Sequence, residues 1–189
     1  MYKPVVVKIG GSTLGNEDTT LKDLVALQRK GIDLVVVHGG GKIISSWMER
    51  HGSHPVFLRG LRVTDPSSLE IVTGVLSGVV NKQLVAALMA LGGKAIGLSG
   101  VDGGILEAQV SDPELGLVGT ITRVNTQPLI KVLEANCIPV IAPIGIQTID
   151  EFAGYGSILN INGDTVAGEL AYTLNAERLV FFTDVEGVM

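Results

Sequence analysis

Short runs of β-branched and apolar residues alternate with amphipathic segments along the chain. Residues 5–9 and 32–37 are two such runs, each closed by consecutive glycines, and both are typical of buried strands that end in a turn. Between them, apolar residues recur at helical spacing over residues 21–27, and Gly31 follows a basic pair as a C-terminal stop. The beginning of the chain therefore predicts a β-α-β unit.

The same alternation continues to the end of the chain. Further helices are predicted over residues 42–51, 66–92, 127–135 and 166–174, and further strands over residues 95–98, 138–141 and 179–182. Residues 105–124 mix apolar residues with Gly, Asp and Pro, which favours a hairpin. Strands that alternate with helices indicate a mostly parallel sheet covered on both faces, with ligands at the C-terminal ends of its strands.

Composition narrows the possible functions. Of the 189 residues 46% are hydrophobic and 17% charged, which is typical of a globular domain. A net charge of -5 offers no basic surface, so neither nucleic acid nor an anionic membrane is expected as a partner. The apolar runs are shorter than a membrane span and the start lacks a secretory signal, so the expected compartment is the cytoplasm. A single cysteine, Cys137, excludes an intramolecular disulfide.

Three glycine-rich turns follow predicted strands. They are Gly10-Gly11, residues 39–41 and residues 97–103. Glycine lets the backbone approach an anion closely and direct its N–H groups at it. Because parallel strands end at one edge of a sheet, the three turns would line one rim. They match neither common nucleotide motif, since G-x-G-x-x-G is absent and Ile43 stands where a P-loop requires Ser or Thr.

Charged and polar side chains accompany these turns. Lys8 lies near the end of the first strand, where its ammonium could reach a phosphoryl group over the rim. Arg62 lies just before a predicted helix, where a guanidinium suits bidentate capture of a carboxylate. A salt bridge between Arg62 and Asp65 would explain the arginine equally well.

A second polar group precedes the helix predicted over residues 166–174. Asp164 is well placed as its N-cap, but a cap would not explain the amides of Asn160 and Asn162 as well. The three histidines have no metal-ligand spacing among themselves, which favours structural roles for all of them. They are His38, His51 and His54.

Taken in order, eight segments resemble the amino acid kinase family along nearly the whole chain. They are residues 7–12, 37–41, 60–65, 80–82, 97–103, 139–145, 160–164 and 183–188. Each is modestly specific alone, but eight in the same order are strongly so. The resemblance implies an α/β fold, a three-layer α/β/α sandwich with a mainly parallel central sheet. It also implies an amino-acid-substrate lobe at residues 1–177 and an incomplete ATP-binding lobe that starts at residues 178–189.

The substrate implied by this resemblance is N-acetyl-L-glutamate. The segments are most similar to family members that transfer the γ-phosphoryl group of MgATP to its side-chain carboxylate, on the route to arginine. By that resemblance, Gly40 and Gly41 would hold the substrate through their backbone. Arg62 and Asn160 would bind its α-carboxylate and neighbouring groups.

The resemblance also implies which residues act on the phosphoryl group. Lys8 would stabilise its charge, and Asp164 would orient the lysines. The proposed nucleotide site comprises Gly10, Gly11, Asp184, Val185, Glu186, Gly187, Val188 and Met189. No residue is assigned to a metal, and Mg²⁺ is expected to arrive with ATP.

The sequence departs from the family pattern in three places. Gly163 stands where alanine is usual, which removes no functional group. The chain begins close to its first strand, without the N-terminal helix of arginine-inhibited hexameric members, so a homodimer without that feedback is expected, formed along residues 66–91. The family's second catalytic lysine would lie after Met189, so no residue here takes its role.

Two alternatives stay open. A sister kinase acting on carrier-linked aminoadipate or glutamate would share the fold and chemistry, although the form of residues 60–65 favours the acetylated substrate. A non-catalytic amino-acid-binding lobe would be the better hypothesis if the natural chain ended at Met189.

Overall fold

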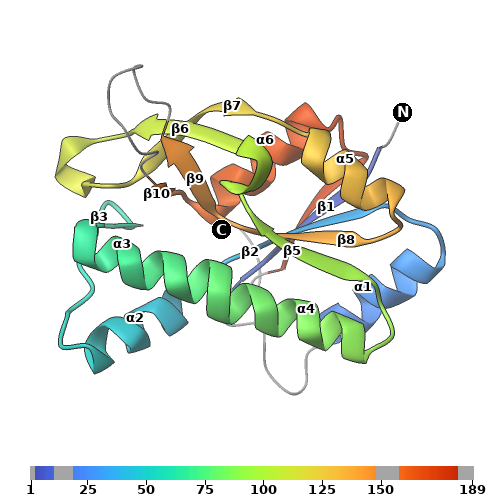
Figure 1. Ribbon diagram of the computed structural model, residues 1–189, viewed down its shortest axis with the longest axis horizontal. Helices are drawn as coiled ribbons and strands as arrows, with labels where there is room; N and C mark the ends of the chain where they lie inside the picture. Colours follow the sequence, from blue (N-terminus) through green and yellow to red (C-terminus); the bar gives the residue numbers. More distant parts are fainter. Residues whose placement is uncertain (1–2, 11–18, 148–157, 183–189) are drawn as a thin grey trace.

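A five-stranded parallel sheet forms the centre of the protein (Figure 1). The computed structural model describes residues 3–10, 19–147 and 158–182. The strand order is β11-β1-β2-β8-β5, and every pairing is parallel, so the C-terminal ends of all five strands meet at one rim. The strands are β1 (Val5–Ile9), β2 (Leu34–His38), β5 (Ala95–Ser99), β8 (Ile138–Ala142) and β11 (Arg178–Phe182).

Alternate residues of the inner strands face opposite sides of this sheet. In β2, Leu34 and Val36 pack into one core, and Val35 and Val37 into another. The first core is covered by α1 (Thr20–Arg29), α2 (Gly41–Arg50) and a long helical run, and the second by α5 (Gln127–Glu134) and α6 (Gly163–Thr173) (Figure 1). The predicted three-layer α/β/α sandwich with a mainly parallel sheet is confirmed.

A second, four-stranded sheet lies next to the rim, in the order β10-β9-β6-β7. The antiparallel hairpin of β6 (Leu106–Val110) and β7 (Gly119–Val124) confirms the hairpin predicted between residues 105 and 124. The sequence did not predict β9 (Ile144–Gln147) or β10 (Ile158–Asn160). Only Pro143 separates β8 from β9, so the chain passes directly from the central sheet into the second one.

A two-residue hairpin, also not predicted, precedes the long helical run. It consists of β3 (Phe57–Leu58) and β4 (Leu61–Arg62), paired antiparallel. Both turn residues have positive φ, 51° at Arg59 and 80° at Gly60, as a type I′ turn requires. Arginine is an unusual residue for this conformation, because its Cβ disfavours the left-handed region.

The predicted helix from Pro66 is one continuous run of three parts. They are α3 (Pro66–Thr73), the π-helical segment η1 (Gly74–Val80) and α4 (Asn81–Ala90). The run begins at a cap, since the Asp65 side chain accepts a 2.7 Å hydrogen bond from the Ser68 N–H. It ends before Gly92, whose φ of 82° confirms the predicted stop. The π turns were not predicted; two glycines of low helix propensity lie within them.

The same run is long and apolar enough, by length and composition alone, to cross a membrane. Six of its apolar side chains are buried in the core on one face of the sheet: Val72, Val75, Leu76, Val80, Leu84 and Leu88. This packing is that of a core helix. A core helix can also be long and apolar enough to meet these length and composition criteria.

Replacing Gly168 by alanine is expected to stabilise the protein by about 1 kcal/mol. Gly168 lies inside α6, and a Cβ there would meet nothing within 4 Å, so the change removes only backbone freedom of the unfolded chain. Urea unfolding measures the difference. Gly93→Ala is the control with the opposite sign, because its Cβ would lie 2.8 Å from Val25 Cγ2 and 3.1 Å from the Leu88 carbonyl oxygen. A gain at both positions would contradict this explanation.

Candidate active site

A cavity of about 200 Å³ opens at the rim, between the N-terminus of α2, the β3–β4 hairpin and the segment that leads into α6. Its walls include Gly40, Arg62, Leu76, Val118 and Asn160. The cavity lies at the rim because the residues that follow β2 and β8 line it, and Asn160 at the end of β10, in the second sheet, contributes to its wall. The glycine turn after β2 therefore lines it, as expected.

Arg62 is the principal charge of the cavity wall, and it is only 8% exposed. Its Nη2 donates to the Gly41 carbonyl oxygen at 3.0 Å and to Ser45 Oγ at 2.8 Å. Its Cζ lies 4.7 Å from the centre of the Phe57 ring, a cation–π contact. These contacts tie the hairpin to α2 and hold the guanidinium in one orientation.

This buried cation has no acidic partner within the described part of the chain. Asp65, the partner considered from the sequence, caps α3 instead; its Oδ1 accepts from the Ser68 N–H at 2.7 Å and from Ser67 Oγ at 2.9 Å. Those hydrogen bonds hold the pKa of Asp65 below its usual value, whereas burial lowers the pKa of Arg62. A desolvated guanidinium facing a cavity favours an anionic ligand, because an anion would restore the interactions lost on burial.

The N-terminus of α2 supplies another part of the cavity wall. Gly40 is the N-cap and Gly41 the first helical residue, and within the described residues their N–H groups donate to no protein acceptor. A helix N-terminus attracts negative charge through such groups and through its dipole. Space also restricts Gly40, since a Cβ there would lie 2.7 Å from Leu76 Cδ2.

Asn160 extends from β10 into the same cavity. Its Nδ2 donates to Thr64 Oγ1 at 3.1 Å, and that fully buried hydroxyl donates in turn to the Arg62 carbonyl oxygen at 3.1 Å. The amide is thus oriented by the residues around Arg62. The structure brings Gly40, Gly41, Arg62 and Asn160 together around one cavity, and their roles remain predictions.

Lys8 and Asp164 meet at the edge of this site. Lys8 Nζ lies 2.9 Å from Asp164 Oδ1, and the two side chains are 15% and 57% exposed. The expectation that Asp164 is the N-cap of α6 is wrong: the cap is Asn162, whose Oδ1 accepts from the N–H groups of Asp164 and Thr165. The Asn162 amide therefore caps the helix, and the Asp164 carboxylate pairs with Lys8 instead.

Gly163 lies between these groups and lines the cavity. A Cβ there would lie 3.6 Å from the His38 carbonyl oxygen and 3.9 Å from Lys8 Cε, which is ordinary contact. An alanine at this position would therefore fit.

The predicted nucleotide residues are described only in part. Gly11 and residues 184–189 lie outside the described residues. Gly10 lies within them, and its N–H donates to the Phe182 carbonyl oxygen at 3.1 Å. No group of three or more His, Cys, Asp or Glu side chains that could hold a metal ion occurs in ranges 3–10, 19–147 and 158–182.

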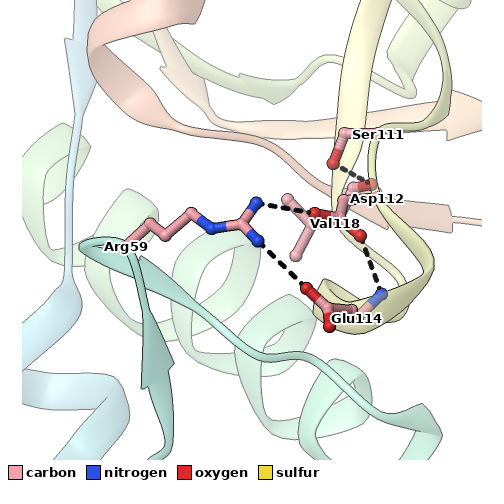
Figure 2. A network of polar contacts seen from close by, with 5 residues as sticks. All are labelled: Arg59, Ser111, Asp112, Glu114 and Val118. Carbon is pink, nitrogen blue, oxygen red and sulfur yellow. Dashed lines mark hydrogen bonds and ion pairs between the residues drawn. The ribbon is translucent and has the colours of Figure 1, made fainter.

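An ion-pair network that the sequence did not suggest fastens the hairpin beside the cavity (Figure 2). Arg59 Nη1 lies 3.2 Å from Asp112 Oδ2, and its Nη2 lies 3.1 Å from Glu114 Oε2. Asp112 Oδ1 accepts from the Glu114 N–H at 2.9 Å, which holds the connection between β6 and β7 in shape. The hairpin that carries Arg62 is thereby joined to the connection that leads to Val118 in the cavity wall.

Arg59→Gln is expected to weaken binding of an anionic ligand in the cavity about threefold. The effect is small because exposed ion pairs contribute little each, and it reaches the ligand because these pairs hold the hairpin that carries Arg62. Glutamine keeps the strain of the positive φ and removes only the charge. Calorimetric titration measures the affinity. The control is Arg123→Gln, which breaks a 3.0 Å ion pair with Glu107 on the second sheet and should leave affinity unchanged. Equal effects of the two changes would contradict a role for the hairpin.

Fold and site together define an α/β protein with a cavity, at the rim of a parallel sheet, whose lining suits a small anionic ligand. Residues 3–189 match the model of the amino acid kinase family, and the chain belongs to that family.

Among its relatives, acetylglutamate kinase of Dehalococcoides mccartyi strain CBDB1 is 45% identical over 184 residues, which are 97% of this chain and 68% of that protein. Curated relatives at 40–45% identity are longer, and the chain spans 61–68% of their length. The solved structure of smu.665 from Streptococcus mutans UA159 matches with a TM-score of 0.88 and 31% identity. The match covers 100% of this chain and 76% of the smu.665 chain. N-acetylglutamate synthase from Neisseria gonorrhoeae, solved with coenzyme A and N-acetyl-glutamate, matches with a TM-score of 0.77 and 29% identity. That match covers 98% of this chain and 42% of the synthase chain.

Proposed function

We propose that this chain holds the substrate site of an acetylglutamate kinase, which transfers the γ-phosphoryl group of MgATP to the side-chain carboxylate of N-acetyl-L-glutamate. The observation that carries the proposal is Arg62, a buried cation without an acidic partner in the described chain, in the wall of a cavity of metabolite size. Relatives at 40–45% identity that bear this name support the choice of substrate.

The dicarboxylate substrate matches the two anion-binding walls. Its α-carboxylate would pair with Arg62, with Asn160 beside it, and its acetyl group would lie among the apolar lining. Its side-chain carboxylate would lie at the N–H groups of Gly40 and Gly41. A phosphoryl acceptor held there needs no covalent chemistry from the protein, since positioning and charge stabilisation suffice.

Lys8 would stabilise the transferring phosphoryl group. Its ammonium lies at the cavity edge, where it forms a 2.9 Å ion pair with Asp164. Mg²⁺ would arrive bound to ATP, and the phosphates would lie across the rim from the amino-acid substrate. The enzyme would act in arginine biosynthesis in the cytoplasm.

Calorimetric titration of the folded chain with N-acetyl-L-glutamate tests the proposal. Glutamate, N-acetylaspartate and UMP are the comparison ligands, because each lacks the acetyl group, the chain length or the carboxylate pair. Selective binding of N-acetyl-L-glutamate is expected. No binding by a sample with a cooperative unfolding transition would overturn the proposal.

One observation favours the carrier-linked alternative. An open groove continues outward from the cavity along α2, lined by Lys42, Ser45, Ser46, Glu49 and Phe57. Such a groove could admit a substituent larger than acetyl on the amino group. A glutamate acylated by a short peptide therefore belongs in the same titration, and tighter binding of this ligand than of N-acetyl-L-glutamate would favour the sister kinase.

We also propose a homodimer formed along the run α3–η1–α4. Its outer face carries small or apolar exposed residues, including Gly74, Gly78, Ala86 and Met89, and the last is 57% exposed. Ile96 on the edge strand β5 is exposed beside it. Analytical ultracentrifugation should detect the dimer, and Met89→Glu should dissociate it; a monomeric wild-type chain would contradict the proposal.

A further inference from the structure

His38 is a buried polar residue that the proposed reaction does not use. It is the last residue of β2, is 1% exposed and does not line the cavity, whereas the next three residues do. Its Nδ1 lies 3.0 Å from the Gly39 carbonyl oxygen, and its Nε2 lies 3.2 Å from Asn81 Nδ2. Both ring nitrogens are therefore engaged, one by the glycine turn and one by α4.

The orientation of the Asn81 amide follows from its other partners. Lys82 Nζ can only donate, and it lies 2.9 Å from Asn81 Oδ1 and 3.1 Å from the Gly97 carbonyl oxygen. The opposite end of the amide lies 2.9 Å from the Val140 carbonyl oxygen and 3.2 Å from the Leu98 carbonyl oxygen, both of which can only accept. The end facing Lys82 is therefore the oxygen, and the end facing the sheet is the NH₂ group.

This orientation determines the tautomer of His38. The amide nitrogen shares two hydrogens among three neighbouring acceptors and cannot itself accept, so Nε2 of His38 faces a donor and carries no hydrogen. Nδ1 faces the Gly39 carbonyl oxygen, which can only accept and therefore requires a hydrogen there. The single hydrogen of the neutral ring is then on Nδ1, and it is donated to the Gly39 carbonyl oxygen. Burial lowers the pKa of His38 to about 4, which agrees with a neutral ring.

The hydrogen bond to Gly39 also determines where the next N–H points. No cis peptide occurs among the described residues, and in a planar trans peptide the carbonyl and the N–H point in opposite directions. The Gly39 carbonyl faces the imidazole, so the N–H of Gly40 is directed away from it. A peptide between two glycines has little steric preference of its own, so an external contact must hold it.

We propose that His38 is a positioning residue that, through Asn81 and Lys82, holds the Gly39–Gly40 peptide so that the Gly40 N–H faces the ligand cavity. This deepens the proposed function, on which it rests for the identity of the ligand. His38 acts through Gly40 and touches no substrate itself.

Two substitutions separate positioning from simple packing. His38→Asn places an amide donor near the position of Nδ1, whereas His38→Leu has similar size and no donor. Binding of N-acetyl-L-glutamate, measured by calorimetry, is expected to weaken about tenfold in His38→Leu, the scale of one hydrogen bond, and to be largely retained in His38→Asn. The control is His54→Leu, at an exposed position, which should change nothing. Equal loss in both His38 variants would overturn the proposal.

A ligand-free measurement decides the claim independently of the substrate. The ¹⁵N NMR signals of the His38 ring should show hydrogen on Nδ1 and none on Nε2 between pH 8 and pH 5. The amide signal of Gly40 should move in His38→Leu and stay close to wild type in His38→Asn. Hydrogen on Nε2, or a Gly40 signal that is the same in all three proteins, would overturn the proposal. Failure of wild type to bind N-acetyl-L-glutamate would refute the proposed function while these signals still decided the role of His38.

Discussion

Arg62→Met is expected to weaken binding of N-acetyl-L-glutamate about a hundredfold while leaving the free energy of unfolding unchanged or higher. Charge-assisted hydrogen bonds to a ligand contribute about 1.5–3 kcal/mol each, and the variant loses them. The variant also loses the hydrogen bonds to Gly41 and Ser45, but this loss is offset because Arg62 is a desolvated cation without an acid nearby in the described chain and methionine fills similar space.

Calorimetric titration and urea unfolding of the same samples measure the two effects. Arg50→Met is the matched control, because Arg50 lies at the end of α2 with its Cζ 5.0 Å from the centre of the Trp47 ring and outside the cavity. It should bind N-acetyl-L-glutamate like the wild type. A strongly destabilised Arg62→Met protein would show that the arginine serves the fold, and unchanged affinity would remove it from the site.

Lowering the pH from 7 to 5 is expected to reduce the free energy of unfolding by about 2 kcal/mol through His38 alone. Its pKa is about 4 in the folded protein and near 6.5 in the unfolded chain, because burial disfavours the charged ring. Between these values only the unfolded chain takes up the proton. The contribution of His38 is therefore complete above pH 6.5 and declines as the pH falls towards 4.

Urea unfolding at several pH values measures this slope, and the difference between wild type and His38→Asn isolates it. His54→Asn, at an exposed position, should keep the wild-type slope. Two carboxyl groups also have shifted pKa values: burial raises that of Asp33, while hydrogen bonds lower that of Asp65, which therefore loses its contribution only in more acidic solution. Identical slopes in wild type and His38→Asn would contradict the prediction.

The sheet was predictable because its inner strands are buried on both faces. Such strands are apolar at nearly every position, as in Leu34–His38 up to its last residue. This apolar run can be recognised without knowing which strands lie beside it. The strands that were missed are short: β3 and β4 have two residues each, β10 has three and β9 has four. So few residues show no period, and their pairing depends on segments distant in the chain.

The site was predictable in its residue types but not in its contacts. The sequence left a salt bridge between Arg62 and Asp65 open, although Asp before Pro66 and two serines is itself a helix-cap pattern. The histidine that precedes the glycines looked merely structural, because its partners come from α4 and, through Asn81, from β5 and β8. No pattern in the sequence indicated a structural role for Arg59, since its ion pairs join residues more than fifty positions apart.

Because η1 is π-helical, the number of residues between the Asp65 cap and Asn81 determines which side chains of this helix reach the site. A π turn holds one residue more than an α turn, so deleting one residue there would restore a regular helix and rotate one part against the other by about 100°. Leu76 could then no longer reach the cavity wall while Asn81 reached His38. Relatives should therefore vary in residue type on the outer face of this helix, but should neither gain nor lose a residue between the Asp65 cap and Asn81.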